Sequence, residues 1–100
     1  MLHPDECNGL TDIRHAIDTL DYELVELLGK RMNYVLAASR FKPDEASIPA
    51  PERVTAMLAD RRLWAQQNGL DGNFVESLFE RIIPWFIARQ VDYWRAQREQ

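Results

Sequence analysis

Four polar residues in this sequence have the types and spacing to bind a small anion: Arg14, Arg31, Lys42 and Gln90. Residues 10–40 follow a helical pattern, in which each residue turns by about 100°. With Leu24 set at 0°, the apolar residues form one stripe, and Arg31 lies at about 340°, in its middle. A guanidinium group keeps its proton, and burying it without a partner costs several kcal/mol. The sequence therefore predicts an internal carboxylate or a bound ligand at Arg31.

The two arginines also have a structural explanation that involves no ligand. Arg14 lies at about 80°, at the edge of the stripe, where a surface ion pair with Asp18 or Asp21 is the simpler interpretation. Arg31 requires a buried acid instead, and Asp21 and Glu52 are the candidates. Both interpretations stay open for Arg31.

Lys42 and Gln90 extend the same pattern. Lys42 follows the expected end of the helix, in a polar loop where a solvated lysine is the ordinary interpretation. Gln90 lies at about 340° from Ile83 on a later helix, where its amide satisfies a backbone group or pairs with its counterpart across a dimer. Two arginines, a lysine and an amide together suit a small dicarboxylate with one further oxygen to bind.

The first element that must position these residues is a long helix over about Leu10–Arg40, capped by Thr11 or Asn8. At 1.5 Å per residue, about 30 residues make a rod of about 45 Å. A compact domain of about 100 residues has a radius of gyration of about 13 Å. The rod is too long to bury its stripe against two other helices of its own chain, so we expect a homodimer in which the long helices of two chains pack together.

A proline-rich loop, Phe41–Pro51, ends the helical period. Pro51 suits the first turn of a second helix that runs to about Gln67, and Asn68-Gly69 is a good stop for it. The inward face of this helix includes the apolar residues Met57, Trp64 and Ala65.

The third helix is expected from a cap at Asp71 or Asn73 to about Arg98. Pro84 lies in its middle, where proline removes the hydrogen bond to the Glu80 carbonyl and favours a kink. The sequence shows no strand pattern and no repeat. It predicts an all-α fold of three helices, long, short and long, as a single domain over residues 1–100.

Composition narrows the function. The chain has 100 residues, 46% of them hydrophobic and 28% charged, which is typical of a soluble globular protein. A net charge of −4 argues against a nucleic-acid binder, and no apolar run approaches the length that a membrane span needs. The single cysteine, Cys7, and the absence of a signal-peptide pattern favour the cytoplasm.

No motif for covalent or metal chemistry is evident. His3, Cys7 and His15 lack the spacing of zinc ligands, and neither a phosphate-binding glycine loop nor a nucleophile elbow occurs. The remaining arginines are expected on solvated faces: Arg61, Arg62, Arg95 and Arg98. If the protein is an enzyme, these features favour a reaction that positioning and electrostatics promote, without a cofactor or metal.

Several segments carry a family resemblance. The segments are CNGLTDIRHAID, RMNYVLAASRFK, IPAPERV, QNGL and the IARQ…YWR ending. Together they resemble the small all-α chorismate mutase family, and most closely its isochorismate-pyruvate lyase branch in bacterial salicylate and siderophore biosynthesis. The resemblance covers nearly the whole chain. It implies an intertwined homodimer and a cofactor-free pericyclic elimination of pyruvate from isochorismate.

The resemblance also implies roles for individual residues. Arg31 and the partner chain's copy of Arg14 would bind the two carboxylates of the substrate. Lys42, on a mobile loop over residues 41–50, would reach the ether oxygen and a carboxylate. Gln90 would hydrogen-bond near the same oxygen, so Lys42 and Gln90 are the expected catalytic residues.

Two further residues complete the expected substrate-binding set. Arg53 matches an arginine that lines the site in the mutases, and Ile87 matches an apolar wall position. The mutases place acids where this sequence has Ala50 and Val54, which favours the lyase. The alternatives are a chorismate mutase, as main or side activity, and, from another class, a non-catalytic helical dimerisation module.

Overall fold

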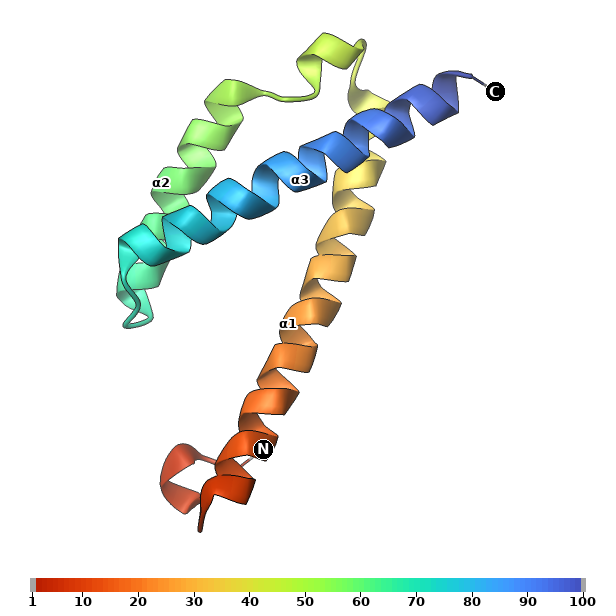
Figure 1. Cartoon of the computed structure of the whole chain (residues 1–100). Coiled ribbons are helices and arrows are strands. Elements are labelled where there is room, and N and C mark those ends of the chain that lie inside the picture. The colour runs from red at the N-terminus through yellow and green to blue at the C-terminus, as the bar shows by residue number, and fades with distance from the viewer. Residues whose placement is uncertain (1, 100) are drawn as a thin grey trace. The chain divides into compact units, whose positions relative to one another are not determined.

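The computed structural model describes residues 2–99, and every regular element there is helical. Figure 1 shows the three main helices, α1 (Leu10–Ala38), α2 (Pro51–Gln67) and α3 (Gly72–Arg98). Three short 3-10 helices lie between or before them: η1 (Pro4–Glu6), η2 (Ser39–Phe41) and η3 (Glu45–Ser47). Over these described residues there is no strand, which confirms the prediction of an all-α chain with three main helices.

The helix bounds lie close to those expected from the sequence. Helix α2 has the predicted bounds, whereas α1 ends at Ala38 and continues as the tighter turn of η2. The predicted Thr11 cap is wrong, because α1 begins at Leu10 and Thr11 lies inside it. The Asp12 carboxylate instead accepts a hydrogen bond from the Asn8 backbone N–H at 3.0 Å. An acid in the first turn thus stabilises the start of α1.

The chain divides into two compact units, and the boundary falls inside α1, between Asn33 and Tyr34. The first unit holds η1 and most of α1. Helix α1 has no buried residue, and its apolar stripe is open, with Ile17 51% and Leu24 53% exposed. In proteins, helices gain most of their stability by packing an apolar face against other elements. Within this chain the apolar stripe of α1 is largely uncovered.

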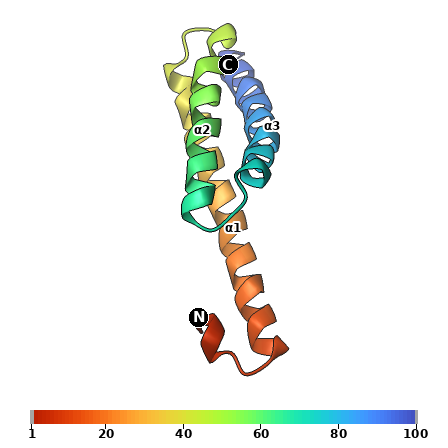
Figure 2. The same ribbon diagram turned by 90° about the vertical axis from the view of Figure 1, so that its left-hand side faces the viewer.

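The second unit is built on an antiparallel pair, α2 and α3, which lie side by side in both views (Figures 1 and 2). The segment with η2 and η3 packs back against α3. The buried apolar residues come from the loop and both helices: Ile48, Met57, Ala65, Val75, Ile83 and Phe86. Ile48, only 2% exposed, anchors the loop in this core.

The turn between α2 and α3 has the predicted chemistry. Gly69 adopts a left-handed φ of 72° after Asn68, and the Asp71 carboxylate accepts a hydrogen bond from the Phe74 N–H at 3.0 Å, which caps α3. At Gly72 a Cβ atom would lie 2.8 Å from Cγ of Arg62. Any other residue there would force the Arg62 side chain to shift, because it crosses directly over the backbone.

Prolines lie at two further positions of interest in the second unit, at the start of α2 and in the middle of α3. Ala50 lies between two prolines and has a left-handed φ of 43°, which for a residue with a Cβ costs about 1–2 kcal/mol. Pro51 then begins α2, as predicted. Pro84 is exposed, and α3 continues through it as one unbroken helix (Figure 1).

Among the described residues no helix is long and apolar enough to span a membrane.

Candidate active site

The loop that carries Lys42 is ordered by its own hydrogen bonds. We call residues 42–48 the Lys42 loop. The Lys42 ammonium group donates to the Ser47 carbonyl at 3.4 Å. The Ser47 N–H donates to the Asp44 carboxylate at 2.9 Å, and the Ser47 hydroxyl donates to the Asp44 carbonyl at 2.8 Å. Lys42 is half-buried, so it is not the solvated lysine of the simpler interpretation.

The last turns of α3 hold this loop from outside. The Trp94 indole N–H donates to the Lys42 carbonyl at 3.3 Å, and an Arg98 N–H donates to the same oxygen at 3.5 Å. Arg95 binds the Glu45 carboxylate with two N–H groups, one of them Nε at 3.1 Å. Arg95 and Arg98 are exposed, as expected for solvated faces, but both also contact the loop.

The ion pair between Glu45 and Arg95 shifts both groups toward their charged forms. The hydrogen bond from Arg95 lowers the pKa of Glu45, and the Glu45 carboxylate raises the pKa of Arg95. Bidentate pairing of this kind fixes orientation as well as distance. The pair therefore joins η3 to α3 in one geometry.

Gln90 is the buried polar group of α3. Its side chain is 5% exposed, and no hydrogen bond joins its amide to another residue in the described part of the chain. Ile87, half-buried, lies one turn before Gln90, and Trp94 lies one turn after it. Gln90 is therefore on the stretch of α3 that leads to the Lys42 loop.

Arg53 and Arg61 place positive charge on α2. Arg53 is exposed, and Arg61 is half-buried, with its guanidinium group 4.6 Å from the Trp64 ring centre and 5.4 Å from that of Phe79. Burial lowers the pKa of Arg61, and the charge of Arg53 lowers it further. The expectation of a solvated Arg61 is wrong. Trp64 itself, expected on the inward face with Met57 and Ala65, is 48% exposed, whereas those two residues are buried.

The Arg62 side chain is 41% exposed, but it also contacts α3. Its guanidinium group donates to the Asn73 side chain and forms an ion pair with Glu76 at 3.3 Å. Because these partners lie in the first turns of α3, Arg62 joins the end of α2 to the start of α3. Its role is structural.

Arg14 and Arg31 belong to the first unit and lie on one continuous helix. Arg14 is exposed and Arg31 is half-buried. Within residues 2–99 no ion pair joins Arg14 to Asp18 or Asp21, so the surface ion pair expected as the simpler interpretation is not present. At 1.5 Å per residue the two arginines are about 25 Å apart along the helix axis. One copy of α1 cannot bring both to the same small molecule.

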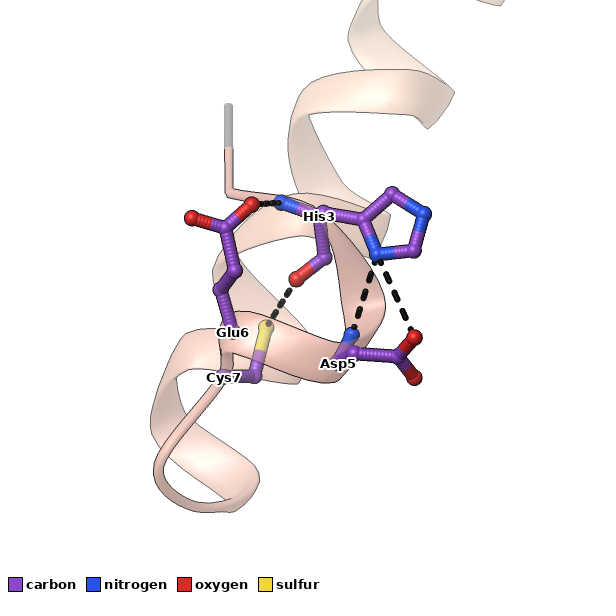
Figure 3. A network of polar contacts seen from close by, with 4 residues as sticks. All are labelled: His3, Asp5, Glu6 and Cys7. Carbon is purple, nitrogen blue, oxygen red and sulfur yellow. Dashed lines mark hydrogen bonds and ion pairs between the residues drawn. The ribbon is translucent and has the colours of Figure 1, made fainter.

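A separate polar network lies at the N-terminus (Figure 3). The His3 Nδ1 atom accepts a hydrogen bond from the Asp5 N–H at 3.3 Å, and the Glu6 carboxylate accepts one from the His3 N–H at 3.3 Å. The Cys7 thiol donates to the His3 carbonyl at 3.7 Å. These contacts cap η1. No group of three or more potential metal ligands is found among the described residues.

The sequence matches the family model described as chorismate mutase type II over residues 13–91. The match extends across both units of the chain. Together with the relative described next, it shows that the chain belongs to the chorismate mutase type II family. The all-α architecture agrees with this assignment.

The chain is 60% identical to the isochorismate pyruvate lyase of Pseudomonas aeruginosa, over 98% of this chain and 97% of that protein. It is 39% identical to the T-protein of Haemophilus influenzae, over 75% of this chain but only 20% of that protein. The T-protein of Enterobacter agglomerans is 35% identical over 74% of this chain and again 20% of its own length. The lyase is therefore matched end to end, and the T-proteins over a small part of their length.

Proposed function

We propose that this protein is an isochorismate-pyruvate lyase, which converts isochorismate to salicylate and pyruvate in salicylate-derived siderophore biosynthesis. The observation that carries the proposal is the 60% identity to a protein of that name over almost the full length of both chains. The family match spans both units, which supports their action as a single domain.

The substrate is a small dicarboxylate, and we assign its two carboxylates to Arg14 and Arg31. Arginine suits this role because its planar donor pairs match a carboxylate. Since about 25 Å of helix separates the two residues, the arginines of one site come from two chains. This distance supports the homodimer, as does the open apolar stripe of α1.

Lys42 and Gln90 are assigned to the reacting part of the substrate. In the elimination, the C–O bond to the ring breaks as a ring hydrogen moves to the terminal carbon of the enolpyruvyl group. Negative charge builds on the departing ether oxygen, and the Lys42 ammonium group stabilises it electrostatically. To do so it exchanges the Ser47 carbonyl for the substrate. The buried amide of Gln90 donates to the same region and gains the partner it otherwise lacks.

Arg53 and Ile87 complete the proposed site. Arg53 adds positive charge for a dianionic substrate, and Ile87, one turn before Gln90, supplies an apolar wall. Holding the substrate in its reactive conformation contributes to the rate without any covalent step. Closure of the loop would exclude water and strengthen each electrostatic contact.

Chorismate mutase is the second candidate, as main or side activity, because the family model carries that name. Ala50 and Val54 offer no carboxylate at the start of α2, which favours the lyase. A non-catalytic dimerisation module would instead need Arg31 neutralised by an internal acid. In that case a change at Arg31 alters stability far more than ligand binding.

The test is to incubate the purified protein with isochorismate and, separately, with chorismate, with chelator present. Salicylate is read by fluorescence and prephenate by chromatography. Salicylate from isochorismate supports the lyase, whereas a predominance of prephenate promotes the mutase. Formation of neither product overturns both activities and returns Arg31 to a structural role.

Lys42→Ala tests the assignment of the charge-stabilising group. We expect a folded protein with kcat lowered by about 100-fold or more, the effect of removing one preorganised electrostatic contact. Circular dichroism and a melting curve check the fold. Normal turnover in a folded Lys42→Ala protein contradicts the mechanism.

A further inference from the structure

The Lys42 loop has an external support that the proposed reaction does not itself use. Three side chains near the end of α3 contact it, and we name Trp94, Arg95 and Arg98 the C-terminal clasp. Two of them donate to one atom, the Lys42 carbonyl, at 3.3 and 3.5 Å. The third binds the Glu45 carboxylate through two N–H groups. All three contacts lie within the second unit of the chain.

We propose that the C-terminal clasp is a set of positioning residues that fixes the backbone of Lys42 and thereby the reach of its ammonium group. The inference rests on the proposed function, because the position of Lys42 matters only if Lys42 acts on the substrate. Its physical basis is the convergence of the contacts. They hold the loop at Lys42 itself and again at Glu45, on either side of the exposed Pro43 and Asp44.

The arginines of the clasp are themselves held in place. The Arg98 guanidinium group lies 4.5 Å from the Trp94 ring centre, so the two donors to the Lys42 carbonyl support each other. Arg95 is fixed in a bidentate geometry that lysine cannot reproduce. On the other side of the loop, the Ile48 side chain is buried in the core. The loop is thus held at its start by the clasp and at its end by Ile48.

The clasp explains how the flexible Lys42 side chain can act in a reaction that requires its ammonium group to be held close to the substrate. A lysine on a free loop loses its conformational freedom only when the substrate binds. A backbone already fixed at Lys42 leaves only the side-chain torsions to be ordered. Loss of the clasp should therefore lower kcat more than it raises KM, because Lys42 acts on charge that develops in the transition state.

The test measures loop opening and turnover separately in Trp94→Phe, Arg95→Gln and Glu45→Gln proteins. Trp94→Phe removes the indole N–H while keeping an aromatic ring, and Arg95→Lys serves as the conservative variant. Trp85→Phe is the matched control, since Trp85 lies on the same helix, is 55% exposed and contacts Phe86 and Arg89 rather than the loop. Amide hydrogen exchange over residues 42–48 reports opening without any substrate.

We expect Arg95→Gln and Glu45→Gln each to speed exchange in the Lys42 loop about threefold to fivefold, the effect of losing a partly exposed ion pair. Their double variant should show no further increase, because both changes remove the same contact. Turnover of isochorismate should fall by a similar or larger factor in kcat, with partial recovery in Arg95→Lys. Trp85→Phe should change neither quantity.

Unchanged exchange in both Trp94→Phe and Arg95→Gln overturns the inference, and so does faster exchange with unaltered kcat. Failure of the proposed function looks different. In that case the unmodified protein forms no salicylate, while the exchange measurement still shows whether the clasp holds the loop.

Discussion

The two units of this chain obtain their stability in different ways. The second unit buries six apolar residues from two helices and a loop, and it fixes its polar segment with ion pairs and hydrogen bonds. Helix α1, which makes up most of the first unit, buries none of its residues. The comparison teaches that the second unit buries an apolar core of its own, whereas the first unit leaves its apolar stripe open, as the proposed homodimer requires.

The sharpest test of this difference is one substitution made in each unit. Ile83→Ala removes a side chain that is 4% exposed and should destabilise the fold by about 2–5 kcal/mol. Ile17→Ala removes one that is half-exposed within the chain, so it should instead weaken self-association by about tenfold or more. Urea denaturation and sedimentation equilibrium measure the two effects. The comparison fails if Ile17→Ala lowers folding stability like Ile83→Ala and leaves association unchanged.

A second test concerns the buried polar group of the second unit. Gln90→Leu should leave stability unchanged or raise it by about 1 kcal/mol, because the amide has no hydrogen-bond partner to lose. The same change should weaken substrate binding and turnover. Thermal melting and steady-state kinetics separate these outcomes. A strongly destabilised Gln90→Leu protein would mean that Gln90 is a structural residue.

The smallest expected effect is the pH dependence of the Lys42 loop. Glu45 has its pKa lowered by Arg95, so the pair stabilises the loop above the ordinary Glu value of 4.5. The stabilisation is lost as the pH falls through the lower pKa of the folded state. Asp92 also faces Arg95 and itself pairs with Arg89 at 3.3 Å. A carboxyl NMR titration should show Glu45 returning toward its ordinary pKa in Arg95→Gln, but not in Arg89→Gln.

The helices were predictable because their signals are local. Pro51, Gly69 and Asp71 act through the conformation or hydrogen bonds of their own backbone neighbourhood, and each appears where the sequence places it. The helical period indicated only the fold, whereas the family resemblance, which the comparisons confirm, also indicated the activity. The Thr11 cap failed because α1 begins one residue earlier, at Leu10, so Thr11 lies inside the helix.

The contacts of the arginines were not predictable from local patterns. Arg95 and Glu45 are separated by 50 positions, and nothing in either neighbourhood indicates that they meet. The contact of Arg61 with Phe79 was unpredictable for the same reason, because Phe79 lies on another helix. The helical period places such residues on a face but does not say what a long, flexible side chain reaches. The roles of Arg14, Arg31, Lys42, Arg53, Ile87 and Gln90 stay predictions.

The length of α1 has a consequence for mixtures of inactive proteins. Arg14→Ala and Arg31→Ala should each be inactive alone, because every site lacks one carboxylate contact. If each site draws these two arginines from different chains, a mixed dimer has one site with both arginines and one with neither. Random exchange of subunits in an equal mixture should therefore restore about a quarter of the unmodified activity. Two inactive proteins would complement each other in a test tube, whereas a site built from one chain would give no recovery at all.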